Sequence, residues 1–547
     1  MLDLLIRGAT VYDGTGKPGV RADVGVAQGK VAAVGAVKDA AKQTLDAGGL
    51  ALMPGIVDVH THYDAQITWD PTLSPSISLG VTTAVLGNCG FGIAPCPARL
   101  RETMLKNLSV VEGMDLDSLL AGTRWEFESF GEYLDALERA RPLANVAVLA
   151  GHSAIRTAVM GDAASARKNP TEKEQHLMKS MLREAMQAGA IGFASSFSPN
   201  HSGWGGQPMP STIATDEELK DLVSVLKEEA KGVFVIASGP RATPEYLEAI
   251  AADTGRPAFM VTVLTMHSAA HPGRAMQYYE RCAAALSRGR EVYIHTSCQP
   301  LSFDFTLREP YILYSHDAFD AVKAASHEDR AAIYRSVSFR QRFRENLKTP
   351  KPGILFAGDW TQVEQDGVQV TELARRAGKD PLDYVFDLPI DTQLVAKLFQ
   401  NDDTAVTPLL QHPSGVLALS DAGAHLIYFC DAGFGLHFLA HWVRELGAFT
   451  LEQGVRRLTS DPARKYRIPG RGAIAPGMSA DLLLFDPARV GISPLERLKD
   501  LPGGGTRMIR RPLGVQGVWV NGARVFDGRQ HLDAARGPGA VLRRFDS

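Results

Sequence analysis

Cysteine is scarce in this chain, and several other features are missing. The 547 residues contain five cysteines, an odd number with no C-x-x-C pair, which argues against a disulfide framework and favours a reducing cytoplasm. No apolar run approaches the roughly 18 residues that span a bilayer, and the first residues lack the apolar run of a signal peptide. A formal charge of −3 gives no electrostatic reason to expect nucleic acid or a membrane as partner. The remaining composition is that of an ordinary globular enzyme in the cytoplasm.

The two ends of the chain resemble each other. Residues 6–14 and 520–528 agree at five of nine positions, and each stretch is typical of two short β-type runs around a glycine turn. We therefore expect one small β-sandwich built from residues 1–54 and 467–547. The catalytic domain is then inserted between the two halves of this sandwich.

Residues 55–466 alternate helix and strand patterns. Three helix starts are indicated by Thr171 with Glu174, Thr215 with Glu218, and Thr243 with Pro244. Short apolar runs lie between these helices, and repeated strand–helix units favour a parallel sheet. The predicted fold is α/β, a (β/α)8 TIM-type barrel. Residues 303–348 are charged, helical and off this pattern, so they are predicted to be an insertion.

Two histidines follow the apolar run of residues 56–59. This run predicts a buried strand, and His60 and His62 lie where it meets a loop. Side chains alternate along a strand, so Asp58, His60 and His62 project the same way. Imidazole nitrogens bind zinc at about 2.0–2.1 Å, so this pair supplies half of a metal site. The alternative is a pair of exposed strand-end histidines, and the distant acid Asp421 favours the metal site.

Asp421 follows the apolar run of residues 415–420, which places its carboxylate at a strand end. A metal ion held by His60 and His62 would lower the pKa of a bound water to about 7 and polarise a carbonyl. Asp421 could then take the proton of the attacking water and pass it to the leaving amine. An aspartate after a strand also serves as a helix cap or turn residue. The histidine pair and the nearby His425 favour the catalytic interpretation.

Several motifs together carry a resemblance to known enzymes. They are Pro54-Gly55-x-x-Asp58-x-His60-x-His62, Gly80-Val-Thr-Thr-x-x-x-Gly-Asn88-Cys89-Gly90, Gly151-His152-x-x-x-Arg156, Ser420-Asp421-Ala-Gly-Ala-His425 and Gly477-x-x-Ala480-Asp481-Leu482. The first and last resemble motifs of the amidohydrolase superfamily, whose catalytic domain is a metal-bearing barrel. The others resemble the N-acyl-D-amino-acid deacylases, or D-aminoacylases, and the resemblance covers nearly the whole chain.

The resemblance has consequences for the metal. In those deacylases a cysteine in the Gly-Asn-Cys-Gly setting is a zinc ligand, which implies that role for Cys89; the alternative is a small buried hydrophobe. The deacylases also have histidines ending their fifth and sixth strands, where this chain has Gly239 and Thr262. His267 and His295 remain alternatives for these positions. We expect one tightly bound divalent ion, zinc, held by His60, His62 and Asp421, with Cys89 close by or coordinating.

Three further residues are candidates for substrate binding. His152 follows a predicted strand, so it can reach a substrate carbonyl or support the metal ligands. Arg156 can bind a substrate carboxylate bidentately or serve as a structural ion-pair partner. His425 is the third candidate, because it closes the motif that contains Asp421. His201 lies in a glycine-rich loop and is expected at the surface.

The expected function is metal-dependent hydrolysis of a C–N bond in a small N-acyl amino acid-like amide. Two alternatives stay open: a cyclic amide or imide hydrolase of the same superfamily, and an inactive barrel that serves as a binding or assembly protein. The expected partner is a small-molecule amide, with neither nucleic acid nor membrane. A homo-oligomer is compatible with the sequence.

Overall fold

The computed structural model describes residues 1–350, 354–426, 430–532 and 537–545. The chain divides into two compact units. The first comprises residues 1–265, 276–298 and 407–547, and the second comprises residues 266–275 and 299–406. The predicted insertion, residues 303–348, lies within the second unit, which also includes residues 266–275, 299–302 and 349–406.

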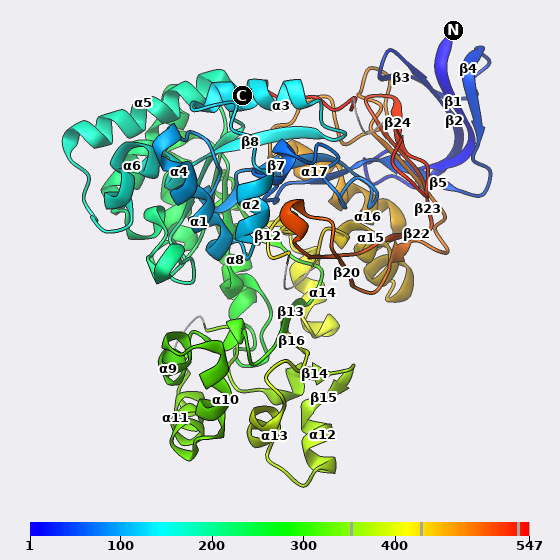
Figure 1. The fold of residues 1–547 in the computed structure, drawn as a ribbon. Coiled ribbons are helices and arrows are strands. Elements are labelled where there is room, and N and C mark those ends of the chain that lie inside the picture. Colours follow the sequence, from blue (N-terminus) through cyan, green and yellow to red (C-terminus); the bar gives the residue numbers. More distant parts are fainter. Residues whose placement is uncertain (351–353, 427–429, 533–536, 546–547) are drawn as a thin grey trace. The chain divides into compact units, whose positions relative to one another are not determined.

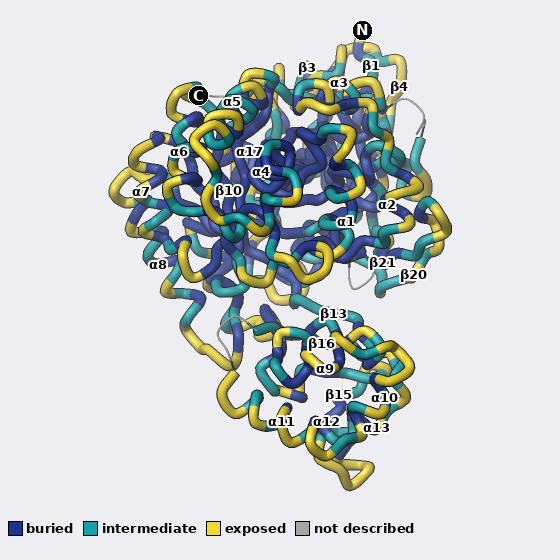
Figure 2. The backbone as a smooth tube through the Cα atoms, turned by 60° about the vertical axis from the view of Figure 1, so that its left-hand side comes forward, coloured by how far each residue is buried: buried dark blue, intermediate teal, exposed yellow. Residues whose placement is uncertain are grey.

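A parallel eight-stranded sheet forms the centre of the first unit (Figure 1). Its order is β17-β12-β11-β10-β9-β8-β7-β6. The bounds are β6 (Ile56–Asp58), β7 (Val81–Leu86), β8 (Asn145–Gly151), β9 (Gly192–Ser196), β10 (Val233–Ala237), β11 (Ala258–Val261), β12 (Val292–Thr296) and β17 (Gly415–Leu417). All residues of these strands are buried (Figure 2), as expected for a parallel sheet covered on its faces. A parallel bridge between Thr61 and Ala422 joins the segments that follow the two edge strands.

Helices connect the strands of this sheet or follow its last strand. They are α1 (Arg101–Val111), α2 (Leu116–Gly122), α3 (Phe130–Ala140), α4 (His152–Met160), α5 (Glu172–Ala188), α6 (Asp216–Glu228), α7 (Pro244–Thr254), α8 (Arg274–Ser287), α14 (Asp403–Gln411), α15 (Phe434–His437), α16 (Leu451–Leu458) and α17 (Ser460–Lys465). The three predicted helix starts are those of α5, α6 and α7. Thr171 and Glu174 form the predicted capping box at the start of α5. Thr215 caps α6 in the same way, but the Glu218 carboxylate does not return to the cap. This carboxylate contacts His152 and Arg156 instead.

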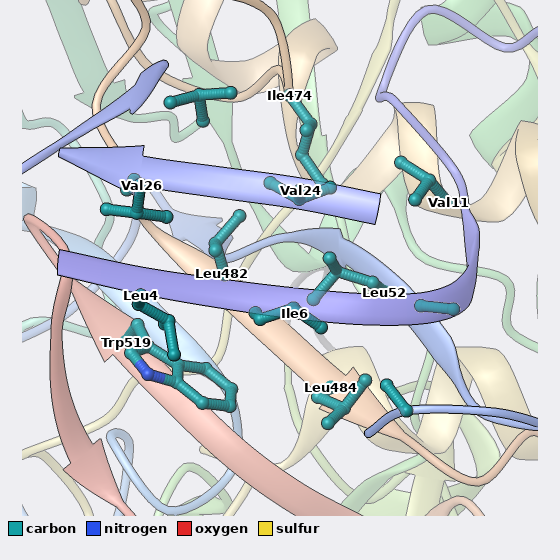
Figure 3. Close-up of a cluster of buried hydrophobic side chains, with 14 residues drawn as sticks. Leu4, Ile6, Val11, Val24, Val26, Leu52, Ile474, Leu482, Leu484 and Trp519 are labelled. Atoms are coloured by element: carbon teal, nitrogen blue, oxygen red, sulfur yellow. The ribbon is translucent and has the colours of Figure 1, made fainter. Parts of the chain in front are cut away.

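The two ends of the chain share a second sheet, ordered β24-β23-β18-β5-β1-β2-β3, with β4 paired to β1. The bounds are β1 (Leu2–Val11), β2 (Val20–Ala27), β3 (Lys30–Gly35), β4 (Ala41–Asp46), β5 (Ala51–Pro54), β18 (Leu482–Phe485), β23 (Val515–Val520) and β24 (Ala523–Phe526). Figure 3 shows side chains from both ends in one buried cluster, among them Leu4, Ile6, Leu482 and Trp519. Both termini therefore contribute to one sheet and one core, whereas the second layer of a sandwich stays a prediction.

The similarity of the two ends in sequence does not extend to their local structure. Asn521 and Gly522 form the two-residue turn between β23 and β24, both with positive φ, which is typical of a type I′ hairpin. Gly8 makes no such turn: it lies inside β1, where the pairing with β2 shifts register between Ile6 and Ala9. The predicted turn at Gly8 is therefore wrong, because this glycine permits a β-bulge in a continuous strand.

The second unit has its own small sheet and helices. The strands are β13 (Leu301–Phe305), β14 (Val363–Gln365), β15 (Val368–Gln369) and β16 (Leu394–Phe399), and the helices are α9 (Asp320–Ala324), α10 (His327–Arg335), α11 (Val337–Lys348), α12 (Val370–Arg376) and α13 (Pro381–Asp387). Phe319, Phe343 and Phe386 pack edge-on or tilted at its centre. Two short pairs complete the first unit: β19 (Gly491–Ile492) with β22 (Pro512–Leu513), and β20 (Glu496–Leu498) with β21 (Arg507–Ile509). No helix among the described residues has the length and apolarity to cross a membrane.

Candidate metal centre

His60 and His62 lie together just after the first strand of the parallel sheet, β6. Their Nε2 atoms are 3.3 Å apart, and both side chains are buried. The backbone between them continues the strand: Thr61 N–H donates to the Val85 carbonyl, and His62 N–H donates to the Ala422 carbonyl. The alternation predicted from the sequence thus brings both imidazoles to the same end of the sheet.

Asp421 reaches this pair from the segment after the last strand, β17. Its Oδ1 is 3.1 Å from His60 Nε2 and 3.5 Å from His62 Nε2. Its backbone has φ 46°, in the left-handed region that non-glycine residues seldom adopt, and Leu419 and His425 share this conformation. Strain of this kind clusters at functional sites, where the surrounding structure holds a side chain in an unfavoured position.

Cys89 approaches from the turn after the second strand, β7. Its Sγ is 3.8 Å from His60 Nε2, and the donor atoms of His60, His62 and Cys89 all lie within 4.8 Å of one another. The turn is held close to the sheet, because Asn88 Nδ2 donates to the Val85 carbonyl at 2.9 Å. A Cβ at Gly87 would collide with the Leu149 carbonyl oxygen, so this approach requires glycine.

The separations measured from His60 Nε2 fit a single divalent ion. Two nitrogens bound to one tetrahedral zinc lie ~3.3 Å apart, and a nitrogen and a thiolate sulfur lie ~3.6 Å apart, given zinc distances of about 2.0–2.1 and 2.3 Å. The observed separations from His60 Nε2 are 3.3 Å to His62, 3.1 Å to Asp421 and 3.8 Å to Cys89. Two imidazoles, a thiol and a carboxylate are also the donor types that zinc prefers.

The electrostatics of the cluster are those of a cation site. Burial lowers the pKa of His60, but its contacts with the Asp421 carboxylate and with Cys89 together outweigh burial and raise the pKa to about 9. Burial raises the pKa of Asp421, but His60 and His62 outweigh it and hold that pKa well below its ordinary value. The carboxylate therefore stays ionised and favours positive charge beside it.

Glu112, which directly follows α1, is a member of the site that no sequence pattern indicated. Its Oε1 is 3.2 Å from His62 Nδ1, and its backbone carbonyl accepts from His425 N–H. Its side chain is only 3 % exposed, and burial raises its pKa to about 7 although the charge of His62 opposes this. No local motif surrounds Glu112, so only the tertiary fold identifies it.

His295 is not one of the donors grouped around His60 Nε2. It lies in β12, and its Nδ1 is 2.9 Å from His60 Nδ1, whereas the other donors surround His60 Nε2. His295 therefore contacts the outer side of the His60 ring. His267 belongs to the second compact unit, where its carbonyl accepts from Gln400 N–H.

His152 and Arg156 both contact Glu218, whose carboxylate takes no part in the cap of α6. His152 Nε2 is 2.9 Å from Glu218 Oε1, and Arg156 Nη1 pairs with the other carboxylate oxygen. All three side chains are at most 1 % exposed. Arg156 also donates to the carbonyls of Ala164, Arg167 and Lys168. This geometry favours the structural ion-pair alternative for Arg156.

His425 and His201 are both half-buried. His425 Nε2 is 3.9 Å from Glu112 Oε2, and burial lowers its pKa to about 4, so the imidazole is neutral. His201 Nδ1 is 2.7 Å from Ser196 Oγ, and its ring packs edge-on against Phe91. Burial is the main cause that lowers the pKa of His201 to about 3. His201 is therefore less exposed than the sequence indicated.

Gly239 and Thr262 stand where the resembling deacylases have histidines, and neither residue offers an imidazole. A Cβ at Gly239 would collide with the carbonyl oxygen of Phe197, which follows β9. Thr262 directly follows β11, and its Oγ1 accepts from Leu264 N–H at 3.2 Å. Backbone from the neighbouring loop thus fills the space in which a side chain at residue 239 would begin.

Comparisons with known proteins agree with this site. A model of the amidohydrolase family matches residues 43–339 and 358–526. D-aminoacylase of Alcaligenes xylosoxydans xylosoxydans is 30% identical to this chain, over an alignment that covers 99% of this chain and 98% of the relative. N-acyl-D-glutamate deacylase of the same organism is 29% identical, and its alignment covers 99% of this chain and 97% of the relative. The crystal structure of N-acyl-D-glutamate deacylase from Bordetella bronchiseptica, complexed with zinc and a phosphonate inhibitor, has a TM-score of 0.68 and 28% identity, and covers 99% of this chain and 100% of its own.

Fold, donor set and similarity together define a metal-dependent hydrolase of carbon–nitrogen bonds other than peptide bonds. The chain belongs to the amidohydrolase family, and its similarity to D-aminoacylases and N-acyl-D-amino-acid deacylases extends over its full length.

Proposed function

We propose that this enzyme hydrolyses the amide bond of N-acyl-D-amino acids, with one zinc ion held by His60, His62, Cys89 and Asp421. The observation that carries the proposal is that donor atoms of His62, Asp421 and Cys89, from three strand ends, all approach His60 Nε2, at 3.3, 3.1 and 3.8 Å. The full-length similarity to deacylases of D-amino acids supports the substrate class. We further propose that the bridged parallel sheet is a closed (β/α)8 barrel.

The residues around the proposed metal ion have separate roles in the reaction. A zinc ion bound there would make a water acidic and polarise the substrate carbonyl. Asp421 Oδ1, ionised and at the edge of the donor group, accepts the proton of the attacking water and delivers it to the leaving amine nitrogen. His425, kept neutral beside Glu112, donates a hydrogen bond to the substrate. His152 and Arg156 support the end of β8 through Glu218 and take no direct part in binding.

The alternative of a cyclic amide hydrolase has weaker support. D-hydantoinase of Ralstonia pickettii is 36% identical, but over 113 residues and 21% of this chain. The crystal structure of L-hydantoinase from Arthrobacter aurescens is 15% identical with a TM-score of 0.51, which concerns the fold alone. An inactive barrel is disfavoured because the donor group of His60, His62 and Cys89 is retained, together with Asp421 beside His60 and its strained backbone.

A substrate panel tests the proposal. Zinc-loaded enzyme is incubated with N-acetyl-D-amino acids bearing neutral and acidic side chains, with their L-enantiomers, and with hydantoin and dihydrouracil. We expect release of free amine from D-substrates, dependent on zinc. Opening of a cyclic substrate without cleavage of any N-acyl-D-amino acid would overturn the proposed substrate class.

A further inference from the structure

The Nδ1 side of the His60 ring, which faces away from the other donors, begins a buried chain of hydrogen bonds. His60 Nδ1 lies 2.9 Å from His295 Nδ1, and His295 Nε2 lies 2.7 Å from the Tyr466 hydroxyl. The three residues come from separate places in the sequence: after β6, within β12, and directly after α17. None is more than 2 % exposed, so water does not compete for these contacts.

The positions of the protons in this chain follow from the inner side of His60. A neutral imidazole has one N–H and one lone pair. His60 Nε2 faces Asp421, His62 and Cys89, and it can bind a cation only with its lone pair. The proton of His60 is therefore on Nδ1 and is donated to His295 Nδ1. The proton of His295 must then be on Nε2, where it is donated to the Tyr466 oxygen.

The opposite arrangement is excluded by geometry. A proton on His295 Nδ1 would face the proton of His60 Nδ1 across 2.9 Å. Only a His60 protonated on Nε2 would relieve that repulsion, and such a ring presents no lone pair to an ion. The Tyr466 hydroxyl, by accepting the His295 Nε2 proton, stabilises the one tautomer of His295 that leaves His60 ready to bind.

We propose that His295 and Tyr466 are positioning residues, which fix the tautomer and ring orientation of His60 for the divalent ion. This inference rests on the proposed metal site. The aromatic surroundings hold the pair rigidly: the Phe259 ring lies 4.3 Å from Tyr466 and 5.7 Å from His295 between centroids. His62 has a different outer neighbour, the carboxylate of Glu112. His60 is thus oriented by the His295–Tyr466 pair, and His62 by a carboxyl group.

The Tyr466 hydroxyl can be removed with a close control. Tyr466→Phe deletes only the oxygen that accepts from His295. Tyr279→Phe deletes an equally buried hydroxyl, which lies 2.7 Å from Thr296 Oγ1, next to His295 in the same strand. Zinc affinity of the metal-free, full-length chain is measured by competition with a chromophoric chelator. Melting of each metal-free protein shows whether the variants fold.

We expect Tyr466→Phe to weaken zinc binding about 10-fold and His295→Phe by about 10–100-fold, the usual range for outer partners of metal ligands. Tyr279→Phe should retain wild-type affinity. The absorption spectrum of bound Co²⁺ should keep the same ligand set in Tyr466→Phe, because His295 is not a ligand. Wild-type zinc affinity in Tyr466→Phe, or equal weakening in Tyr279→Phe, would overturn the inference. Intact zinc binding without deacylase activity would instead contradict only the proposed function.

Discussion

At the scale of single residues, Asp421 has the most demanding position. Its left-handed backbone and two histidine neighbours place one carboxylate oxygen where both a metal ion and a water can meet it. Asp421→Asn keeps the shape and removes the proton acceptor. We expect turnover to fall by at least about 10²–10⁴-fold, the usual contribution of general acid–base catalysis. Steady-state kinetics and melting curves would check this, and a variant within threefold of wild type would place the base elsewhere.

Glu218 is expected to contribute strongly to stability, because its carboxylate neutralises the buried Arg156. Glu218→Gln keeps the size but leaves a buried cation without its anion, which typically costs about 3–5 kcal/mol. The exposed pair of Glu228 with Arg183 offers a matched control, and Glu228→Gln should cost no more than about 1 kcal/mol. Urea unfolding of both variants measures the difference.

The pH dependence of this loss has a definite sign. Although burial opposes it, contact with His152 and Arg156 lowers the pKa of Glu218 below the ordinary 4.5. A carboxyl with a lowered pKa stabilises the fold above its ordinary pKa, and this contribution is lost as the pH falls through the lowered value. The gap in unfolding free energy between wild type and Glu218→Gln should therefore be full at pH 7 and shrink below pH 4.5. A gap that grew in acid would contradict the ion pair.

At the scale of elements, the short-range patterns in the sequence were reliable. Strand alternation placed His60 and His62 correctly, and the capping signals at Thr171 and Thr215 marked the starts of α5 and α6. Partners far along the chain were beyond such patterns. Tyr466 is 171 residues from His295, and nothing around either residue encodes that contact. Likewise, Gly8 indicates a turn or a bulge equally well until the pairing partners are known.

The loop after β9 gives a prediction of its own, because it fills the place of a missing side chain. Gly239→His restores the residue type of the resembling deacylases, yet its Cβ would meet the Phe197 carbonyl oxygen. We expect lower stability and no additional bound metal. Elemental analysis together with a melting curve tests this, and a second tightly bound ion in a stable variant would refute the explanation.

The shared terminal sheet predicts that the two ends of the chain depend on each other. Residues 500–547 supply β23 and β24, and β23 is the partner of β18, which in turn pairs with β5. Deleting them exposes the edge of β18 and removes Trp519 from the core. Trp519→Ala alone should cost about 3–5 kcal/mol. Both variants should melt well below wild type; an unchanged melting temperature for the truncated chain would mean that the N-terminal strands are stable without them.

At the scale of the whole molecule, the number of metal ions follows from how the chain surrounds the site. Three strand ends supply His60, His62, Cys89 and Asp421, and structural zinc sites rarely use fewer than four protein ligands or catalytic sites fewer than three. A second ion would have to share Cys89, because residues 239 and 262 offer no imidazole. We therefore expect about one equivalent of zinc after exhaustive dialysis, and His60→Ala should abolish both metal and activity. His267→Ala should keep that one equivalent, because His267 is not a member of the donor group found among the described residues. Two equivalents that survive dialysis would show that a further ligand set exists, and loss of one of them in His267→Ala would identify it.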